Sequence, residues 1–195
     1  SLRLALSVGL AATIIVAVQG HMHGNLVAKL QPAKLAAMEA HWETAKNAPM
    51  YLLQIPDEKN EKNLVQAMPV PSLLSLLAFN DPDAEVKGLK DFAPADRPPV
   101  GITFLAFRVM VGIGTLMPLL MLIGFLRREN YCPTYLKVLV WAIPLPYLGM
   151  QAGWAVAEVG RQPWIVYGLM RTADAVSPIT ATQAGSSLVA MVLLY

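Results

Sequence analysis

Residues 102–126, with the sequence ITFLAFRVMVGIGTLMPLLMLIGFL, decide the fold class of this chain. A helix needs about 20 consecutive apolar residues to cross the hydrocarbon core of a membrane, and this run is longer than that. Arg108 is the charged residue that interrupts it, and Arg127 and Arg128 follow it directly. The run therefore predicts a membrane-spanning helix that ends at two cations.

The composition of the whole chain also indicates a membrane protein. Of the 195 residues, 55% are hydrophobic and 14% are charged, whereas an ordinary soluble domain has about 25% charged residues. The one cysteine, Cys132, excludes an internal disulfide framework. The basic residues are not clustered on one face, so the sequence gives no support for nucleic-acid binding.

Three further stretches are apolar enough to enter a membrane. Residues 4–18 and 138–159 are both apolar, and Pro144 and Pro146 are expected to kink or open the second of them. Ser177-Pro178 is typical of the N-cap and first residue of a last helix that runs to Tyr195. These patterns predict an all-α, polytopic membrane helical bundle with a large periplasmic loop.

The expected organisation has four spans and two outer loops. The chain is interpreted as a fragment of a longer protein, because it does not begin with methionine and it ends within an apolar run. The expected spans are residues 1–18, 101–128, 136–159 and the start of a truncated one at 179–195, and the expected loops are 19–100 and 160–178.

Residues 19–100 are expected to face water, because ten of the 13 acidic residues of the chain lie there. Within this loop, residues 32–44 (PAKLAAMEAHWET) predict a helix that begins at a proline. Residues 72–79 are apolar enough to lie on the membrane surface, and residues 91–100 hold too many prolines for a long helix.

The basic residues of the short loops predict the orientation of the chain in the membrane. Arg161 and Arg171 lie on one side, and more cations lie on the other, which is therefore expected to be cytoplasmic: Arg3, Arg127, Arg128 and Lys137. Both outer loops are then periplasmic. Met110 and Glu158 are expected near that same outer face.

Arg108 and Met110 are the candidate cofactor-binding residues of the span 102–126. A charge costs about 2.5 to 3.5 kcal/mol at the centre of a membrane helix, so Arg108 needs a counter-charge, a carbonyl cluster, a water-filled cavity or an anionic cofactor group. The thioether of Met110 can ligate haem iron, although core packing is the commoner role of a methionine. On a helix the two side chains are about 200° apart, so only a wide ligand such as haem could meet both.

Residues 153–164, GWAVAEVGRQPW, place Glu158 at the end of the next span. Glu158 could be a haem-iron ligand, a proton-relay acid or a partner of Arg161, and the salt bridge is the leading interpretation from the residues alone. Trp154 lies on the same helical face as Glu158. By default, Trp154 and Trp164 are packing and interface residues.

Lys34 and Glu39 are the candidate residues of the outer loop. On a helix they point about 140° apart, so they could flank a ligand from two sides. A quinol site needs a carboxylate that accepts protons and a cation that polarises the quinol oxygen. A solvated amphipathic helix is the simpler interpretation of the same pattern. His21 and His23 form only a weak metal signal, and we do not expect a metal there.

Five sequence blocks together resemble subunit I of the cytochrome bd quinol oxidases. The resemblance extends over essentially the whole chain, and it implies the sixth span, a short quinol loop, the seventh and eighth spans and the start of the ninth. The blocks are QPAKLAAMEAHWET (31–44), VKGLKDFAPADRPPV (86–100), FRVMVGIG (107–114), GWAVAEVGRQPWIVYG (153–168) and LMRTADAVSP (169–178).

The resemblance implies a role for each candidate residue. Met110 is similar to the methionine ligand of the low-spin b haem, and Arg108 to the arginine that stabilises that haem. Glu158 is similar to the axial ligand of the high-spin b haem, with Trp154 packed nearby. Arg161 and Trp164 belong to the GRQPW block. Lys34 and Glu39 match the pair implicated in quinol binding and oxidation.

The implied activity is oxidation of ubiquinol or menaquinol with reduction of O2 to water, through two b haems and haem d, which contributes to the proton motive force. The implied location is the bacterial cytoplasmic membrane, with subunit II and a small accessory subunit as partners. The histidine ligand of the low-spin haem would lie outside this chain. Two alternatives stay open from the residues alone: a transporter or channel fragment with intramembrane charges, and a cofactor-free membrane interaction protein.

Overall fold

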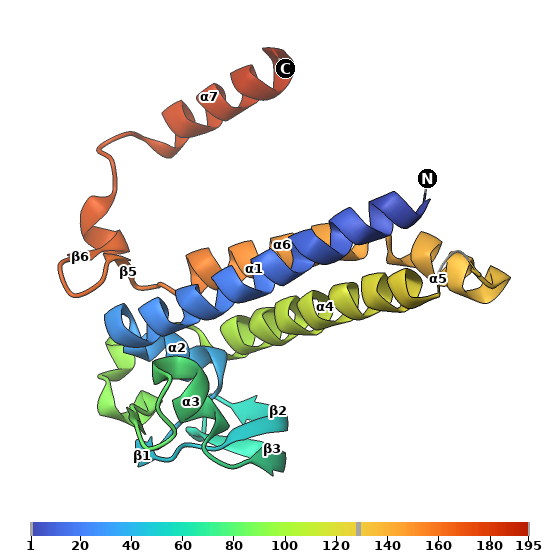
Figure 1. The fold of residues 1–195 in the computed structure, drawn as a ribbon. Coiled ribbons are helices and arrows are strands. Elements are labelled where there is room, and N and C mark those ends of the chain that lie inside the picture. Colours follow the sequence, from blue (N-terminus) through green and yellow to red (C-terminus); the bar gives the residue numbers. More distant parts are fainter. Residues whose placement is uncertain (1, 128–129, 195) are drawn as a thin grey trace.

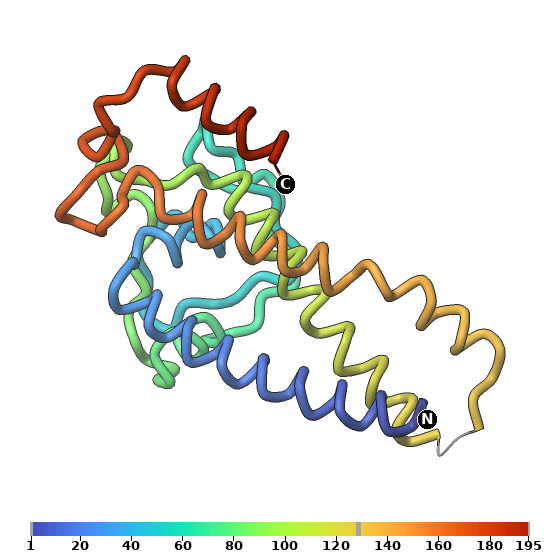
Figure 2. Tube along the Cα trace, turned by 90° about the horizontal axis from the view of Figure 1, so that it is seen from above, coloured from blue at the N-terminus to red at the C-terminus, as the bar shows by residue number. Residues whose placement is uncertain are grey.

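Three long helical segments lie side by side in the computed structural model, which describes residues 2–127 and 130–194. Helix α4 (Val100–Leu126) packs against α1 (Leu2–Leu30) on one side and against α6 (Leu145–Val159) on the other (Figures 1 and 2). Helices α1 and α4 are long and apolar enough to cross a membrane. The membrane-bundle class predicted from the sequence is therefore confirmed.

Helix α1 continues well past the apolar segment 4–18 and ends at Leu30. Its extension is held by α3 (Leu73–Phe79), because Asn25 Nδ2 donates to Leu77 O at 2.5 Å and Asn80 Nδ2 donates to Asn25 Oδ1 at 2.7 Å. His21 Nε2 lies 2.9 Å from Asn80 Oδ1, so this histidine takes part in the same contact.

The segment 136–159 forms two helices with a break between them. Helix α5 (Pro133–Ala142) ends just before Pro144, and α6 starts at Leu145, so the predicted break at this proline is confirmed. Helix α4 also contains a proline, Pro118, which the helix accommodates. Arg128, predicted to close α4 together with Arg127, lies outside the described residues, as does Tyr195.

Close packing between α4 and α6 depends on glycines of α6. A Cβ added to Gly153 would lie 3.0 Å from Met110 Sδ, and one added to Gly149 would lie 3.1 Å from Ile113 Cγ2. Small residues four apart let membrane helices approach closely, which is the packing expected where no water drives the helices together.

The loop between α1 and α4 folds into a small layer at one end of the bundle (Figure 1). Helix α2 (Pro32–Met38) begins at the predicted proline, but it ends at Met38, so the predicted helix over 32–44 is too long. Ala40 has a φ of 44°, a left-handed conformation that cannot continue a helix.

Three small two-stranded antiparallel sheets, which the sequence did not predict, lie in the loops. The largest is the hairpin of β2 (Met50–Asp57) and β3 (Lys62–Val70), in which Leu53 pairs with Ala67. The other strands and short 3-10 helices are β1 (Ala45–Lys46), β4 (Glu85–Val86), η1 (Leu89–Asp91), η2 (Pro94–Asp96), β5 (Trp164–Val166), β6 (Met170–Arg171) and η3 (Thr172–Ala175).

The hairpin turn fixes the start of α4. Val100 N and Gly101 N donate to the carboxylate of Glu58 at 3.1 and 3.3 Å, so a negative charge sits at the N-terminus of the helix. Arg97 Nη1 donates to Glu61 Oε1 at 2.7 Å and ties the same turn to the approach to α4.

Helix α7 (Ala181–Leu194) projects away from the three-helix bundle and has no buried residue in this chain (Figure 1). It begins after Ser177 and Pro178, so the predicted helix start at these two residues is wrong. The first helical residue is Ala181, and Thr180 caps the helix: Gln183 N donates to Thr180 Oγ1 at 3.3 Å, and Thr180 N donates to Gln183 Oε1 at 3.0 Å.

Candidate functional site

Two arginine–carboxylate pairs lie where the loops 19–100 and 160–178 meet the helices. The first joins Arg108 of α4 to Glu39, at the end of α2, with Nη2 donating to Oε2 at 2.8 Å. The second joins Arg161 to Glu158 at the end of α6, with Nη2 donating to Oε2 at 2.5 Å. Of the partners considered for Arg108, the structure supplies a counter-charge, and the Glu158–Arg161 salt bridge favoured from the residues alone is confirmed.

The left-handed turn at Ala40 ends α2 and leaves Glu39 as its C-cap residue. Only 4% of Glu39 is exposed, and the apolar cluster that closes over this region includes Ala36, Trp42 and Phe104. An acid buried in this way needs a cation, and Arg108 supplies it. The guanidinium of Arg108 also lies over the Phe104 ring, with 5.0 Å to its centroid.

Burial raises the pKa of Glu39 to about 7, and the nearby Arg108 acts in the opposite direction. A carboxyl group with this pKa exchanges protons near neutral pH, as a general base requires. Oε2 accepts from Arg108, whereas Oε1 makes no hydrogen bond to the part of the chain that the structure describes. One oxygen is thus held by the cation and the other is free to take a proton.

Lys34 contacts α6, whereas Glu39 contacts Arg108 of α4. The Lys34 ammonium donates to Ala157 O at 3.3 Å, near the C-terminal end of α6, where cations are favourable. Burial and the nearby Arg161 lower the pKa of Lys34, and Glu158 partly offsets them. Lys34 and Glu39 therefore contact two different helices, α6 and α4, as their angular separation on α2 suggested.

Met110 and Arg108 also have different neighbours. The Met110 sulfur faces Gly153 of α6, whereas the Arg108 guanidinium faces Glu39 and the loop. The predicted separation of these two side chains around the helix is confirmed. The glycine leaves room beside the sulfur, which a larger residue at 153 would fill.

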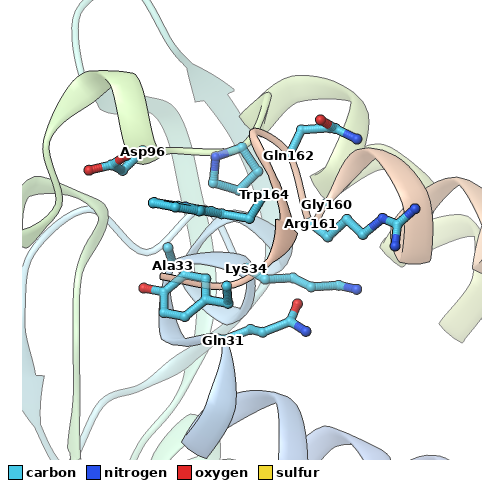
Figure 3. A pocket seen from close by; sticks show the side chains of 10 residues that line it. Gln31, Ala33, Lys34, Asp96, Gly160, Arg161, Gln162 and Trp164 are labelled. Carbon is cyan, nitrogen blue, oxygen red and sulfur yellow. The ribbon is translucent and has the colours of Figure 1, made fainter. Parts of the chain in front are cut away.

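The end of α6 is more open. The side chain of Glu158 is 43% exposed, and Trp154, one turn earlier, is 66% exposed. Trp164 follows in β5 and lies 5.9 Å from Tyr167, ring centroid to ring centroid. Figure 3 shows Lys34 and Arg161 extending to the same side of Trp164, with Asp96 on its other side.

Three buried N–H groups near these pairs have no acceptor among residues 2–127 and 130–194: Arg108 Nε, Arg161 Nε and Trp164 Nε1. Buried donors are nearly always paired, so these three suit an anionic acceptor such as a carboxylate. These donors suit the propionates of haem groups, and the Met110 thioether and the half-exposed Glu158 carboxylate are each of a type that can ligate iron.

Several contacts of this region were missed by sequence reasoning. The pairing of Glu39 with Arg108 joins residues 69 positions apart, and Asp96 accepts a hydrogen bond from Arg171, 75 positions away. One signal was present: Glu39 is an acid within the apolar stretch AAMEA. That pattern indicates a buried carboxylate, but it does not name the partner.

These features define a helical membrane protein with a buried acid–base pair and with donors that suit a haem. The family model described as "Cytochrome bd terminal oxidase subunit I" matches residues 1–195. The chain therefore belongs to the cytochrome bd terminal oxidase subunit I family, as its sequence blocks predicted.

Relatives and a solved structure agree with this membership. The chain is 39% identical to the cytochrome bd ubiquinol oxidase subunit 1 of Bacillus subtilis, over 100% of this chain and 45% of the relative. It is 30% identical to the cytochrome bd-II ubiquinol oxidase subunit 1 of Escherichia coli, over 87% of this chain and 46% of the relative. The bd oxidase structure from Geobacillus thermodenitrificans matches with a TM-score of 0.83 and 35% identity, over 100% of this chain and 45% of that one. The chain thus spans about half the length of these relatives.

Proposed function

We propose that this chain is part of a terminal quinol oxidase of the bacterial cytoplasmic membrane. The complex oxidises ubiquinol or menaquinol and reduces O2 to water, which contributes to the proton motive force. Two quinols give four electrons and four protons, and one O2 takes up four electrons and four protons to form two waters. Family membership and the buried Glu39–Arg108 pair support this proposal, and the pair is the observation that carries it.

Glu39 is proposed as the proton acceptor in quinol oxidation. Its pKa of about 7 lets the carboxylate take a proton near neutral pH, and Oε1 is the oxygen that receives it, since Arg108 holds Oε2. The positive charge of Arg108 remains beside the carboxyl group and keeps the ionised form accessible after the proton leaves. Proton release then occurs on the outer side, because the loop 19–100 is proposed to be periplasmic.

Lys34 is proposed to bind the quinol oxygen. Within residues 2–127 and 130–194, its ammonium makes one hydrogen bond, to the Ala157 carbonyl at 3.3 Å, near the long end of the normal range. A substrate oxygen is a better partner for a charged donor. The cation would polarise the quinol hydroxyl and lower the cost of removing its proton. Lys34 and Glu39 therefore divide orientation and proton transfer between them.

Met110 and Glu158 are proposed as iron ligands of the low-spin and high-spin b haems. The sulfur of Met110 lies between α4 and α6, and the carboxylate of Glu158 lies at the end of α6. Arg108 Nε, Arg161 Nε and Trp164 Nε1 are proposed to donate to anionic groups of these haems, with Trp154 packed beside Glu158. When bound, the haems supply one-electron transfer and, with haem d, reduction of O2.

Subunit II and a small accessory subunit are proposed as partners. The exposed apolar side chains of α1, α4 and α7 support contact with lipid or with further helices. Arg3, Arg127 and Lys137 support a cytoplasmic location for the opposite end of the bundle.

The test is a dithionite-reduced minus oxidised optical spectrum of the purified holoenzyme, together with quinol-driven oxygen uptake by the same sample. We expect the bands of haem b and haem d and uptake that depends on quinol. A folded, partner-containing sample without haem would contradict the proposal and favour a transporter, in which Arg108 and Glu158 would be pathway charges.

A further inference from the structure

The segment from the end of α6 to β6 is held against the loop 19–100 at two separate points. Lys34 Nζ donates to Ala157 O from one side. On the other side, Arg171 Nη2 of β6 donates to Asp96 Oδ1 at the end of η2. Glu158 and Arg161 lie between these two contacts along the chain. The loop 19–100 therefore contacts the segment 157–171, which includes Glu158, at both of its ends.

The Asp96 contact is more than a surface ion pair, because Arg171 has a second partner. Its guanidinium lies over the Trp164 ring, 4.9 Å from the ring centroid. An arginine that is ion-paired and stacked at once has few free rotamers. Asp96 orients the guanidinium of Arg171, and the guanidinium in turn packs on the Trp164 ring and restricts its position.

Hydrogen bonds connect the β5–β6 hairpin to the end of α6. Thr172 N donates to Pro163 O at 2.9 Å, which closes the β5–β6 hairpin. Trp164 N donates to Arg161 O at 3.0 Å, and Gln162 Nε2 donates to Glu158 O at 3.3 Å. Figure 3 shows Trp164 between Asp96 on one side and Lys34 and Arg161 on the other, and all four residues line the same small pocket.

We propose that Asp96 and Arg171 are positioning residues that hold the Glu158 end of α6 in register with the quinol-binding loop. This inference rests on the proposed function, since it takes Glu158 as a haem ligand and Lys34 as a quinol contact. Among the described residues, no hydrogen bond or ion pair joins Asp96 or Arg171 to Glu158 or Lys34. It sets where the carboxylate of Glu158 lies relative to Lys34, and thus the geometry of the high-spin haem site.

A matched control lies next to Asp96 in the sequence. Arg97 forms an ion pair with Glu61 at 2.7 Å, and its hydrogen bonds to the described residues all lie within the loop 19–100. Loss of this pair removes a comparable interaction from the same loop without releasing α6. Its effect therefore reports general loosening of the loop.

The experiment compares Asp96→Asn, Arg171→Gln, the double variant and Arg97→Gln in the purified holoenzyme. The readouts are the high-spin and low-spin haem signals of the same sample and the KM for quinol. A half-exposed pair changes an equilibrium by up to about fivefold, so we expect a high-spin signal reduced or shifted within that range. The low-spin signal should stay unchanged, and the double variant should resemble the single ones, because both remove the same contact.

Further variants separate positioning from folding. Asp96→Glu keeps the carboxylate and should restore most of the high-spin signal, and Arg97→Gln should leave both haem signals as in the wild type. Unchanged high-spin signals in Asp96→Asn and Arg171→Gln would overturn the inference, as would equal losses of both haems. A wild-type holoenzyme without any high-spin haem would overturn the proposed function itself, and the positioning role with it.

Discussion

The two arginine–carboxylate pairs differ in how the fold makes them. Glu158 and Arg161 are three residues apart, and about 40% of each side chain is exposed, 43% and 37%. Glu39 and Arg108 come from a loop and a membrane helix, and only 3% of the Glu39 side chain is exposed. The Glu158–Arg161 pair joins neighbours in the sequence and is exposed to solvent, whereas the Glu39–Arg108 pair is buried and forms only when distant segments pack together. Proton chemistry near neutral pH requires the second kind, because burial is what raises the carboxyl pKa.

The largest effect is expected from Met110→Leu, which removes the sulfur that faces Gly153 of α6 and nearly keeps the volume of the side chain. The low-spin haem signal should be lost from the reduced-minus-oxidised spectrum, since leucine cannot ligate iron. Met117→Leu, one to two turns further along α4, is the matched control and should keep the signal. An unchanged low-spin spectrum in the first variant would refute the assignment of Met110.

Glu39→Gln tests the buried pair itself. The amide keeps the shape of the side chain but cannot accept the proton, so the turnover with quinol should fall by about 100-fold or more while the haem spectra persist. Glu43→Gln is the control, because Glu43 is 73% exposed and pairs with Lys90 at the loop surface. Comparable activity in the two variants would remove Glu39 from the proposed mechanism.

Arg108→Gln should destabilise the protein, because it leaves the Glu39 carboxylate buried without its cation. Breaking a buried pair in this way costs about 3 to 5 kcal/mol, which a thermal unfolding series can measure. The double variant with Glu39→Gln should recover much of the loss, since no charge is then buried. Additive losses would show that the pair is not coupled.

A smaller effect concerns the pH dependence of stability. The folded-state pKa of Glu39 is about 7, above its ordinary value of 4.5, so the folded protein binds the proton more tightly than the unfolded chain. Stability from this group is full below about pH 4.5 and is lost as the pH rises through about 7, by on the order of 3 kcal/mol. Unfolding measured from pH 4.5 to 8 should show this decline in the wild type and a flatter curve in Glu39→Gln. Identical slopes would contradict the burial argument.

The local parts of the fold and site could be predicted from the sequence. Apolar runs predicted α1 and α4, the two helices that are long and apolar enough to cross a membrane. Pro144 predicted the break between α5 and α6, and three-residue spacing predicted the Glu158–Arg161 pair. These features depend on residues that are near one another in the chain. The start of α7 was misplaced because Ser177 and Pro178 have the right chemistry for a helix start, but the helix begins at Ala181.

Features that depend on distant residues could not be predicted. Helix α2 ends because Ala40 is left-handed, and alanine has no preference for that conformation. This turn leaves Glu39 as the C-cap residue of the helix. The β2–β3 hairpin was hidden by prolines at 56 and 69. Arg108 clearly needed a counter-charge, yet only the folded chain identifies which of the acids supplies it.

The pH dependence of kcat/KM for quinol, measured on the holoenzyme with wild-type chain and with Glu39→Gln, tests the central claim most directly. This ratio reports the ionisation of the free enzyme. We expect a wild-type kcat/KM that rises with pH to a plateau above about 7, where Glu39 is ionised, and a low kcat/KM without that rise in the variant. The same rise at full activity in Glu39→Gln would contradict the claim that Glu39 accepts the quinol proton.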